Sequence, residues 1–520
     1  MPVDTPAWAR DAVFYQVFPD RFANSPRVPK PGPLEPWDAP PTWHGFKGGD
    51  LRGIVDRLDE LADLGVTALY LTPVFASASN HRYHAYDYHH VDPLLGGNEA
   101  LRELIDALHA RGMRIILDGV LNHCGRGFWP FHHVAEAGGS SPYAGWFHLD
   151  DEVRAGRRGL SPYPGPTEEA EQHRRLAEGM WGGEASRRTY GYEGWWGLPA
   201  LPKLNTDHPG ARAYLLDVAE RWLRFGIDGW RLDVAEEIDD GFWEEFRSHC
   251  RAVNPDAYLV AEVWHEKPSW LTGLHFDALM NYPLGEAILG YAGGDTLDLG
   301  VARLHEAYGR GVFHRDAPAL AGEIERLLGV YDPDVTNVML NLLGSHDTPR
   351  IRTVLGGDLD ALRIATLLQL ALPGAPCIYY GDEIGMEGLQ DPGNRAGYPP
   401  VLPGGAEGAH RDFVRAAIRL RRNHRALRDG ATRIAHAEGM TLGVLRTEGP
   451  EAFLVVVNPG RDAAAPEIAL PDAHGTPIVA ELPGWEAGPE RDAVWVPGGR
   501  LRVRVPGRSG AVVRLHAGTL

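Results

Sequence analysis

Residues 227–234 read IDGWRLDV, a short apolar run that carries an arginine and an aspartate near its end. Similar runs recur between about residues 10 and 430, and most precede a segment with the spacing of an amphipathic helix. They span residues 12–22, 66–75, 113–123, 257–264, 276–283, 336–347 and 376–383. Eight strand–helix units predict an α/β fold, a closed (β/α)8 TIM barrel, with an open doubly wound sheet as the alternative.

The repeating pattern is interrupted once and ends near residue 430. Residues 123–207 are rich in Gly, Trp, Tyr and Pro and have weak periodicity, which predicts a subdomain inserted after the third strand. The barrel then comprises residues 1–122 and 208–430. Residues 431–520 hold short alternating strands with Gly and Pro turns, which predict a C-terminal antiparallel β-sandwich.

Composition narrows the class of protein. The chain has no run of 18 apolar residues and no signal-peptide pattern, and its formal net charge is −19. That charge argues against nucleic acid or an anionic membrane as a partner and is compatible with a neutral substrate. The three cysteines form no CxxC pair, which excludes a disulfide framework and a zinc ribbon. We therefore predict a protein of the reducing cytoplasm.

Carboxylates stand at the ends of four predicted strands, namely Asp118, Asp233, Glu262 and Asp347. In a barrel the carboxyl ends of the strands share one face, so these groups converge. Arg231 points to the same side of its strand as Asp233 and would hold that carboxylate ionised. Glu262 follows the apolar run AYLVA, where burial would raise its pKa. One charged and one protonated carboxyl group are what glycoside hydrolysis requires, although a lone acid after a strand is more often a helix cap.

The strand-end motifs together resemble the α-amylase family, glycoside hydrolase family 13. The family motifs D-x-x-x-N-H, G-x-R-x-D, a strand-end glutamate and H-D occur here in the family's order. They are matched by Asp118, Asn122 and His123, by Gly229, Arg231 and Asp233, by Glu262, and by His346 and Asp347. The resemblance covers roughly residues 10 to 520.

The resemblance implies roles for these residues in a retaining reaction through a covalent β-glucosyl enzyme. Asp233 would be the nucleophile, Glu262 the general acid/base, and Asp347 would bind hydroxyls of the distorted sugar. The residues implied to bind or orient substrate are Tyr83, His81, Asp118, His123, Arg231, Trp264 and His346. Retention predicts that the carboxyl groups of Asp233 and Glu262 lie about 5–5.5 Å apart.

The segment LPKLN, residues 201–205, looks like the M-P-K-L-N motif of neopullulanases, cyclomaltodextrinases and maltogenic amylases. It implies a hydrolase that cleaves α-1,4 and also α-1,6 bonds in maltooligosaccharides, cyclodextrins or pullulan. Trp264, on the acceptor side, would support transglycosylation. The alternatives are a glucanotransferase, a maltose–trehalose isomerase, or an inactive relative that serves as a scaffold.

The chain departs from that subgroup in three places. Predicted strand 1 begins near residue 12, so the subgroup's N-terminal domain is not expected and the oligomeric state stays open. Glu236 stands where the subgroup often has asparagine. The loop that binds calcium in relatives is rich in proline here, which leaves Asn24, Gly48 and Asp50 as candidate ligands for a structural calcium ion. The reaction itself requires no cofactor.

The stretch HRYHAYDYHH, residues 81–90, permits two interpretations. Its histidine spacing does not exclude a metal, yet it follows no recurring ligand pattern. The resemblance instead implies that Tyr83 stacks under a sugar, that Asp87 supports the pocket and that His81 borders it. We favour the sugar platform.

Overall fold

The computed structural model describes residues 3–471 and 473–518, and its central feature is an eight-stranded parallel sheet. In spatial order the strands are β8 (Ala278–Leu279), β7 (Tyr258–Ala261), β6 (Gly229–Leu232), β5 (Arg114–Gly119), β2 (Ala68–Leu71), β1 (Phe14–Val17), β10 (Ala375–Tyr379) and β9 (Leu340–Leu342). A parallel bridge joins Met280 to Leu340, and the Asn281 N–H donates to the Leu340 carbonyl at 2.8 Å. This contact joins the two outer strands, so the sheet is a nearly closed barrel, as predicted, and not an open sheet.

The strands are shorter than the apolar runs that predict them. The run at 12–22 forms β1 and then the short helix α2 (Pro19–Phe22), because Pro19 cannot donate in a ladder but suits a first helical turn. Likewise the run at 336–347 opens with the end of α16 (Pro333–Thr336) before β9. The barrel strands are buried on both faces, which explains their continuous apolar character.

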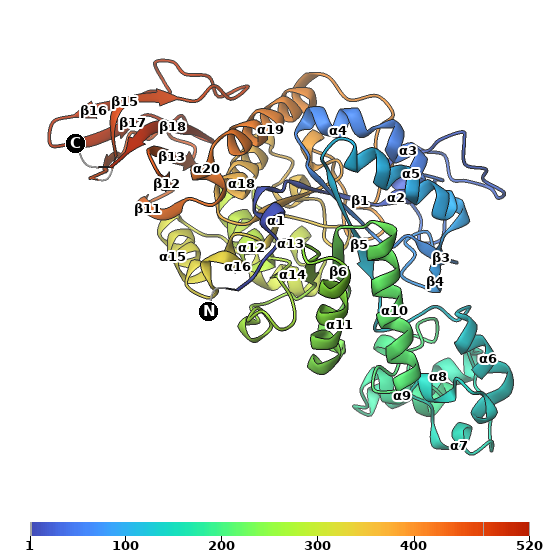
Figure 1. Ribbon diagram of the computed structural model, residues 1–520. Coiled ribbons are helices and arrows are strands. Elements are labelled where there is room, and N and C mark those ends of the chain that lie inside the picture. The colour runs from blue at the N-terminus through green and yellow to red at the C-terminus, as the bar shows by residue number, and fades with distance from the viewer. Residues whose placement is uncertain (1–2, 472, 519–520) are drawn as a thin grey trace.

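Helices surround the barrel (Figure 1). The main ones are α3 (Leu51–Asp56), α4 (Leu58–Leu64), α5 (Gly97–His109), α10 (Pro209–Phe225), α11 (Asp240–Val253), α12 (Tyr282–Ala292), α15 (Ala317–Leu328), α18 (Leu359–Ala371) and α19 (Gly405–Asn423). Shorter ones are α1 (Ala7–Asp11), α13 (Leu299–Ala302), α14 (Glu306–Gly311), α17 (Ile351–Val354) and α20 (Arg425–Arg428). Helix α10 illustrates how a helix ends before a barrel strand. Gly226 caps it with a φ of 111°, which glycine adopts without strain, and the chain then enters β6.

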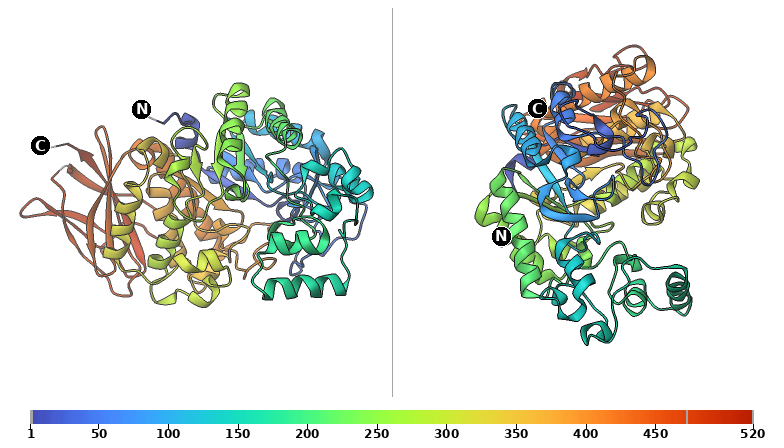
Figure 2. Two further views of the ribbon diagram at one scale, coloured as in Figure 1. Left: turned by 90° about the horizontal axis from the view of Figure 1, so that it is seen from below. Right: turned by 90° about the vertical axis from the view of Figure 1, so that its right-hand side faces the viewer.

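The insertion between β5 and α10 is mainly helical and projects from the barrel (Figures 1 and 2). It contains α6 (Trp129–Ala137), α7 (Asp151–Arg154), α8 (Pro166–Ala177), α9 (Gly182–Tyr190) and the 3-10 turn η4 (Trp195–Gly197). An antiparallel bridge from His123 to Lys203 ties its two ends together beside the barrel. A hairpin of β3 (Phe75–Ser77) and β4 (Ala85–Val91) follows β2.

The C-terminal part consists of two antiparallel sheets. One has the order β11 (Ala431–Glu438), β12 (Thr441–Glu448), β13 (Glu451–Asn458), β18 (Ser509–Ala517) and β15 (Ala473–Val479); the other has β14 (Glu467–Ala469), β17 (Arg500–Val503) and β16 (Ala493–Val496). On β13, Leu454 and Val456 belong to the core between the sheets, whereas Phe453 and Val455 belong to the core shared with the barrel. The larger sheet is therefore buried on both sides, which confirms the sandwich and explains the unbroken apolar run in β13.

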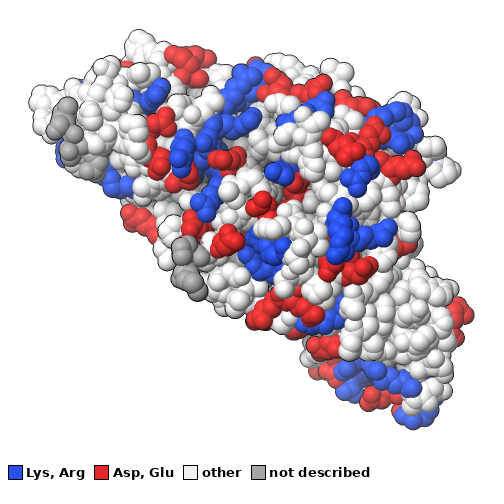
Figure 3. Space-filling view, in the orientation of Figure 1, with Lys and Arg blue, Asp and Glu red and all other residues white. Residues whose placement is uncertain are grey.

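On the face in Figure 3, acidic and basic side chains alternate over the described residues and do not gather into an extended patch of one sign. Among the helices in the described part of the chain, none has the length and apolar character needed to cross a bilayer.

Candidate active site

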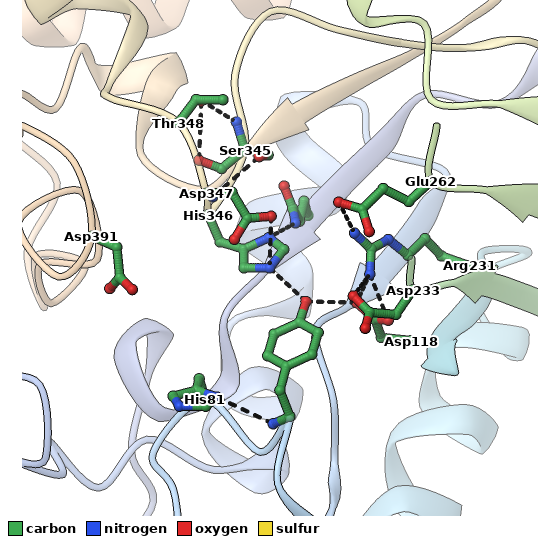
Figure 4. Close-up of polar contacts among 12 residues, drawn as sticks. His81, Asp118, Arg231, Asp233, Glu262, Ser345, His346, Asp347, Thr348 and Asp391 are labelled. Atoms are coloured by element: carbon green, nitrogen blue, oxygen red, sulfur yellow. Dashed lines mark hydrogen bonds and ion pairs between the residues drawn. The ribbon is translucent and has the colours of Figure 1, made fainter. Parts of the chain in front are cut away.

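Arg231 lies at the centre of a buried cluster of carboxylates (Figure 4). Its Nη1 is 2.8 Å from Asp233 Oδ1 and 2.9 Å from Asp118 Oδ1, and its Nη2 is 2.9 Å from Glu262 Oε1. The guanidinium group is fully buried, and the three carboxylates are at most 6% exposed. One positive charge thus holds three acids from three strands.

The strand order explains why these residues meet. Strands β5, β6 and β7 are neighbours, and Asp118 pairs in register with Arg231. Asp233 and Glu262 each follow the last residue of their strand, at the carboxyl end of the barrel. Val234, next to Asp233, has a φ of 39°, which is strained for a β-branched residue, and its N–H donates to Glu262 Oε2 at 2.9 Å.

The charges in this cluster affect one another. Burial raises the pKa of Asp118 to about 6, and Arg231 opposes this effect. Burial also raises the pKa of Asp233 well above its ordinary value, again against Arg231, with Glu262 and Asp118 adding to the rise. Burial and the neighbouring carboxylates therefore favour the protonated form of Asp233, and the Arg231 guanidinium favours its ionised form. The structure raises the pKa values of Asp118 and Asp233; the raised pKa that the sequence predicts for Glu262 stays a prediction.

A chain of hydrogen bonds leads to Asp118 from the other side of the barrel. Gln16 Nε2 lies 2.8 Å from His346 Nδ1, and His346 Nε2 contacts the Tyr83 hydroxyl. That hydroxyl donates to Asp118 Oδ2 at 2.9 Å, and Tyr70 donates to the same oxygen at 2.8 Å. Because an amide N–H can only donate, Nδ1 of His346 accepts and Nε2 carries the hydrogen. Burial lowers the pKa of His346, so the ring is neutral, as this arrangement requires.

Asp347 faces this chain from the loop after β9. Its Oδ2 is 3.3 Å from His346 Nε2, and its Oδ1 is 3.4 Å from Arg395 Nη2. The side chain is 27% exposed, more than the other acids of the site, so it is the carboxylate that reaches furthest toward solvent.

Trp264 belongs to a stack of rings beside Glu262. Tyr282 lies against it at 3.7 Å between centroids and an angle of 14°, and His305 at 4.5 Å and 18°. Tyr282 is buried, so a sugar on this side would meet the half-buried rings of Trp264 and His305.

Comparison with known proteins identifies the family. The family model described as alpha amylase, catalytic domain, matches residues 16–433. The chain belongs to the α-amylase family. A cyclomaltodextrinase from Geobacillus thermopakistaniensis is 40% identical, over 94% of this chain and 76% of the relative. Neopullulanase 2 from Thermoactinomyces vulgaris is 37% identical, over 93% of this chain and 75% of the relative. The crystal structure of the debranching enzyme from Nostoc punctiforme is 39% identical, covers all of both chains and superimposes with a TM-score of 0.83.

Membership of this family makes the protein a glycoside hydrolase, and the similarity to cyclomaltodextrinases and neopullulanases confirms the subgroup that LPKLN predicts. In this glycoside hydrolase, His123 and His81 each lie against an aromatic side chain. His123 is fully buried and stacks on Trp195 at 4.7 Å between centroids. His81 lies against Tyr83, whose backbone N–H donates to its Nδ1 at 3.2 Å.

The other histidines of the 81–90 stretch have separate partners. His89 pairs with Asp217 at 3.1 Å, and His90 pairs with Asp87 at 2.7 Å. Asp87 also accepts from the His89 N–H at 2.8 Å, and 43% of its side chain is exposed; the pocket role implied for it stays a prediction. Within the described ranges, no group of three or more His, Cys, Asp or Glu residues could hold a metal ion.

The calcium candidates have other tasks in this structure. Asp50 is fully buried and accepts from the N–H groups of Gly53 at 2.7 Å and Ser25 at 2.9 Å. The Lys30 ammonium group donates to its Oδ2 at 3.1 Å and to the Leu94 carbonyl at 2.5 Å. Asp50 is thus neutralised by a residue of the proline-rich loop.

The remaining two candidates do not complete a cation site. Asn24 is exposed, and the Gly48 N–H donates to Asp20 at 3.2 Å. A calcium ion needs six to eight oxygen ligands. As arranged, these three residues do not fit one, because an ammonium group already lies against the only carboxylate among them.

Sequence reasoning missed several members of the site. Gln16 and Tyr70 lie within barrel strands, and Tyr282 opens α12 with its hydroxyl buried. The sequence contains little indication of these residues. It shows that a polar side chain occurs within an apolar strand, but it does not show whether that side chain points toward the site. Arg395 comes from a loop whose position only the fold defines.

Proposed function

We propose that the protein is a retaining α-glucan hydrolase that cleaves α-1,4 and also α-1,6 bonds in maltooligosaccharides, cyclodextrins or pullulan. The observation that carries this proposal is the shared guanidinium: Arg231 forms an ion pair with Asp233 through Nη1 and with Glu262 through Nη2. Two carboxyl groups fixed on one rigid fork can flank a single glycosidic bond. The cyclomaltodextrinase and neopullulanase relatives support the choice of α-glucans.

In the first step of the proposed reaction, an oxygen of Asp233 attacks the anomeric carbon while Glu262 donates a proton to the departing sugar oxygen. In the second step Glu262 takes a proton from water, which displaces Asp233 from the sugar. Arg231 orients Asp233, and Asp347 binds hydroxyls of the distorted ring. The neutral His346 offers its Nε2 hydrogen to Tyr83, and both Tyr83 and Asp118 face the same sugar.

The attack requires an ionised Asp233, and the charge of Arg231 opposes the effect of burial on the pKa of that carboxyl group. Arg231 contacts both Asp233 and Glu262, so its positive charge lies next to each of the two carboxyl groups that react. Arg231 thus favours the charge on Asp233 that the first step requires.

Transfer to a second sugar instead of water is part of the proposal. The stack of Trp264, Tyr282 and His305 offers an apolar surface beside Glu262 on which an acceptor sugar can lie. A glucanotransferase or maltose–trehalose isomerase would depend on the same surface, so the product ratio separates these alternatives from the hydrolase.

The test is to incubate the protein separately with γ-cyclodextrin, pullulan, soluble starch and maltotriose and to identify the products, with Asp233→Asn as the inactive control. We expect hydrolysis of at least one substrate to small sugars. Conversion of maltose, tested as a fifth substrate, chiefly to trehalose or longer glucans, with little glucose, would contradict the hydrolase proposal. We also propose that the protein acts in the cytoplasm, since its three cysteines are free and buried.

A further inference from the structure

A stack of three aromatic rings leads from the buried site to the surface. His123 and Trp195 are nearly parallel, at 5° and 4.7 Å between centroids, and Trp195 and Trp196 follow at 21° and 4.6 Å. His123 is fully buried, Trp195 is half-buried and Trp196 is 74% exposed. Trp196 is thus the outer ring of a stack whose inner ring belongs to the proposed sugar site.

The position of this stack relative to the carboxylates is fixed by its neighbours. The segment after η4 returns past the site, where Lys203 bridges to His123 and its ammonium group lies 2.8 Å from Glu237. Glu237 follows Asp233 by a single turn, η5 (Ala235–Glu237). The rings therefore stand at the carboxyl end of the barrel, where the insertion meets the loop after β6.

The backbone of Trp196 is strained in a way that presents its ring. Its φ is 52°, in the left-handed region that bulky residues rarely adopt. The first residue of α9, Gly182, packs so closely that an added Cβ would lie 2.9 Å from the Trp196 carbonyl carbon. Strain of this kind persists where surrounding structure holds it and is typical of functional sites.

Polar atoms beside the stack also lack partners. His123 Nε2 and Trp195 Nε1 are both buried and have no hydrogen-bond partner within the protein. Buried polar atoms are normally paired, and each such exception calls for an explanation. Trp196, at the exposed end of the same stack, offers a planar apolar face on which a sugar ring can lie.

We propose that Trp196 is a specificity-determining residue, a platform on which a glucosyl unit remote from the cleaved bond stacks. This inference rests on the proposed α-glucan hydrolase activity and extends it. Chains long enough to reach Trp196 gain a contact that short substrates lack, so the enzyme favours longer α-glucans.

The experiment compares kcat/KM for maltoheptaose with kcat/KM for maltotriose in each variant. In Trp196→Ala the ratio of the two should fall by roughly threefold to tenfold, the range of a stacking contact. Trp196→Phe should keep most of the ratio because it keeps a planar ring, whereas Trp196→Leu should lose it. Trp129→Ala is the matched control: Trp129 is 58% exposed on α6, but its ring packs on His133 and Tyr143 and not on His123.

The outcomes separate this inference from the proposed function. A wild-type protein that cleaves neither oligosaccharide would remove the proposed function and this inference with it. If the wild type is active and Trp196→Ala keeps the ratio, only the platform is wrong. A ratio that falls equally in the Phe and Leu variants, or a changed oligomeric state with an unchanged ratio, would also overturn the platform.

Discussion

The hydroxyl of Tyr83 lies 2.9 Å from Asp118 Oδ2 and also contacts His346 Nε2. Tyr83 thereby links Asp118 of one strand-end motif to His346 of another, so its hydroxyl group helps to hold both side chains in position. We predict that Tyr83→Phe lowers kcat/KM by about tenfold or more, since a hydrogen bond to a charged group is worth about 1.5–3 kcal/mol. Tyr70→Phe is the control, because Tyr70 donates to the same oxygen but has no bond to His346. We expect a smaller loss there; equal losses would show that the link to His346 has no special role.

The charge of Asp118 should appear in the pH profile. Asp118 raises the pKa of Asp233 by charge repulsion, and the acidic limb of kcat/KM reports ionisation of the nucleophile in the free enzyme. Asp118→Asn removes that repulsion, so the pKa of Asp233 falls and the acidic limb moves to lower pH.

A buried carboxylate elsewhere provides the control for this shift. Asp277 precedes β8 at the opposite end of the barrel and pairs with Arg247 at 2.8 Å. Asp277→Asn should leave the limb in place. An acidic limb that stays fixed or moves upward in Asp118→Asn would contradict the coupling between the two aspartates.

The barrel and the carboxylate cluster could be predicted because both depend on short-range patterns. Apolar runs define the strands, and the geometry of any such barrel brings their carboxyl ends together. Asp118, Arg231, Asp233 and Glu262 meet for that reason. The distribution of pKa values could not be predicted, since it depends on one guanidinium facing three acids at once.

Other features depend on contacts between distant segments. Lys30 meets Asp50 and Leu94 only when the proline-rich loop folds back. The insertion contains helices α6 to α9, none of which was predicted from the sequence.

Removal of calcium should not affect stability. The Lys30 ammonium group neutralises Asp50, so we expect the same Tm with EDTA and with added calcium. Lys30→Met leaves a fully buried carboxylate without its cation and should lower the free energy of unfolding by about 1–3 kcal/mol.

Arg27→Met tests whether this effect is specific. Arg27 is in the same loop and pairs with Asp56 at 2.9 Å, but both side chains are about half exposed, and such pairs contribute about 0–1 kcal/mol. A wild-type Tm that drops on chelation would refute the account of Lys30.

The rings beside Glu262 should control transfer. Trp264→Ala removes the middle of the stack with Tyr282 and His305, so we expect the ratio of transfer to hydrolysis to fall by about threefold or more. Trp264→Phe should retain most of it. The ratio is measured from the products of maltotriose. An unchanged ratio in the alanine variant would show that the acceptor sugar does not bind on Trp264.

The central claim is that Asp233, held by Arg231, forms a covalent bond to the sugar. A ring-fluorinated α-glucosyl fluoride forms such an intermediate faster than it is hydrolysed, and mass spectrometry of the digested protein locates the label. We predict that the label lies on Asp233 and that Asp233→Asn takes up none. A label on another residue, or turnover of natural substrate with inversion at the anomeric carbon, would contradict this account.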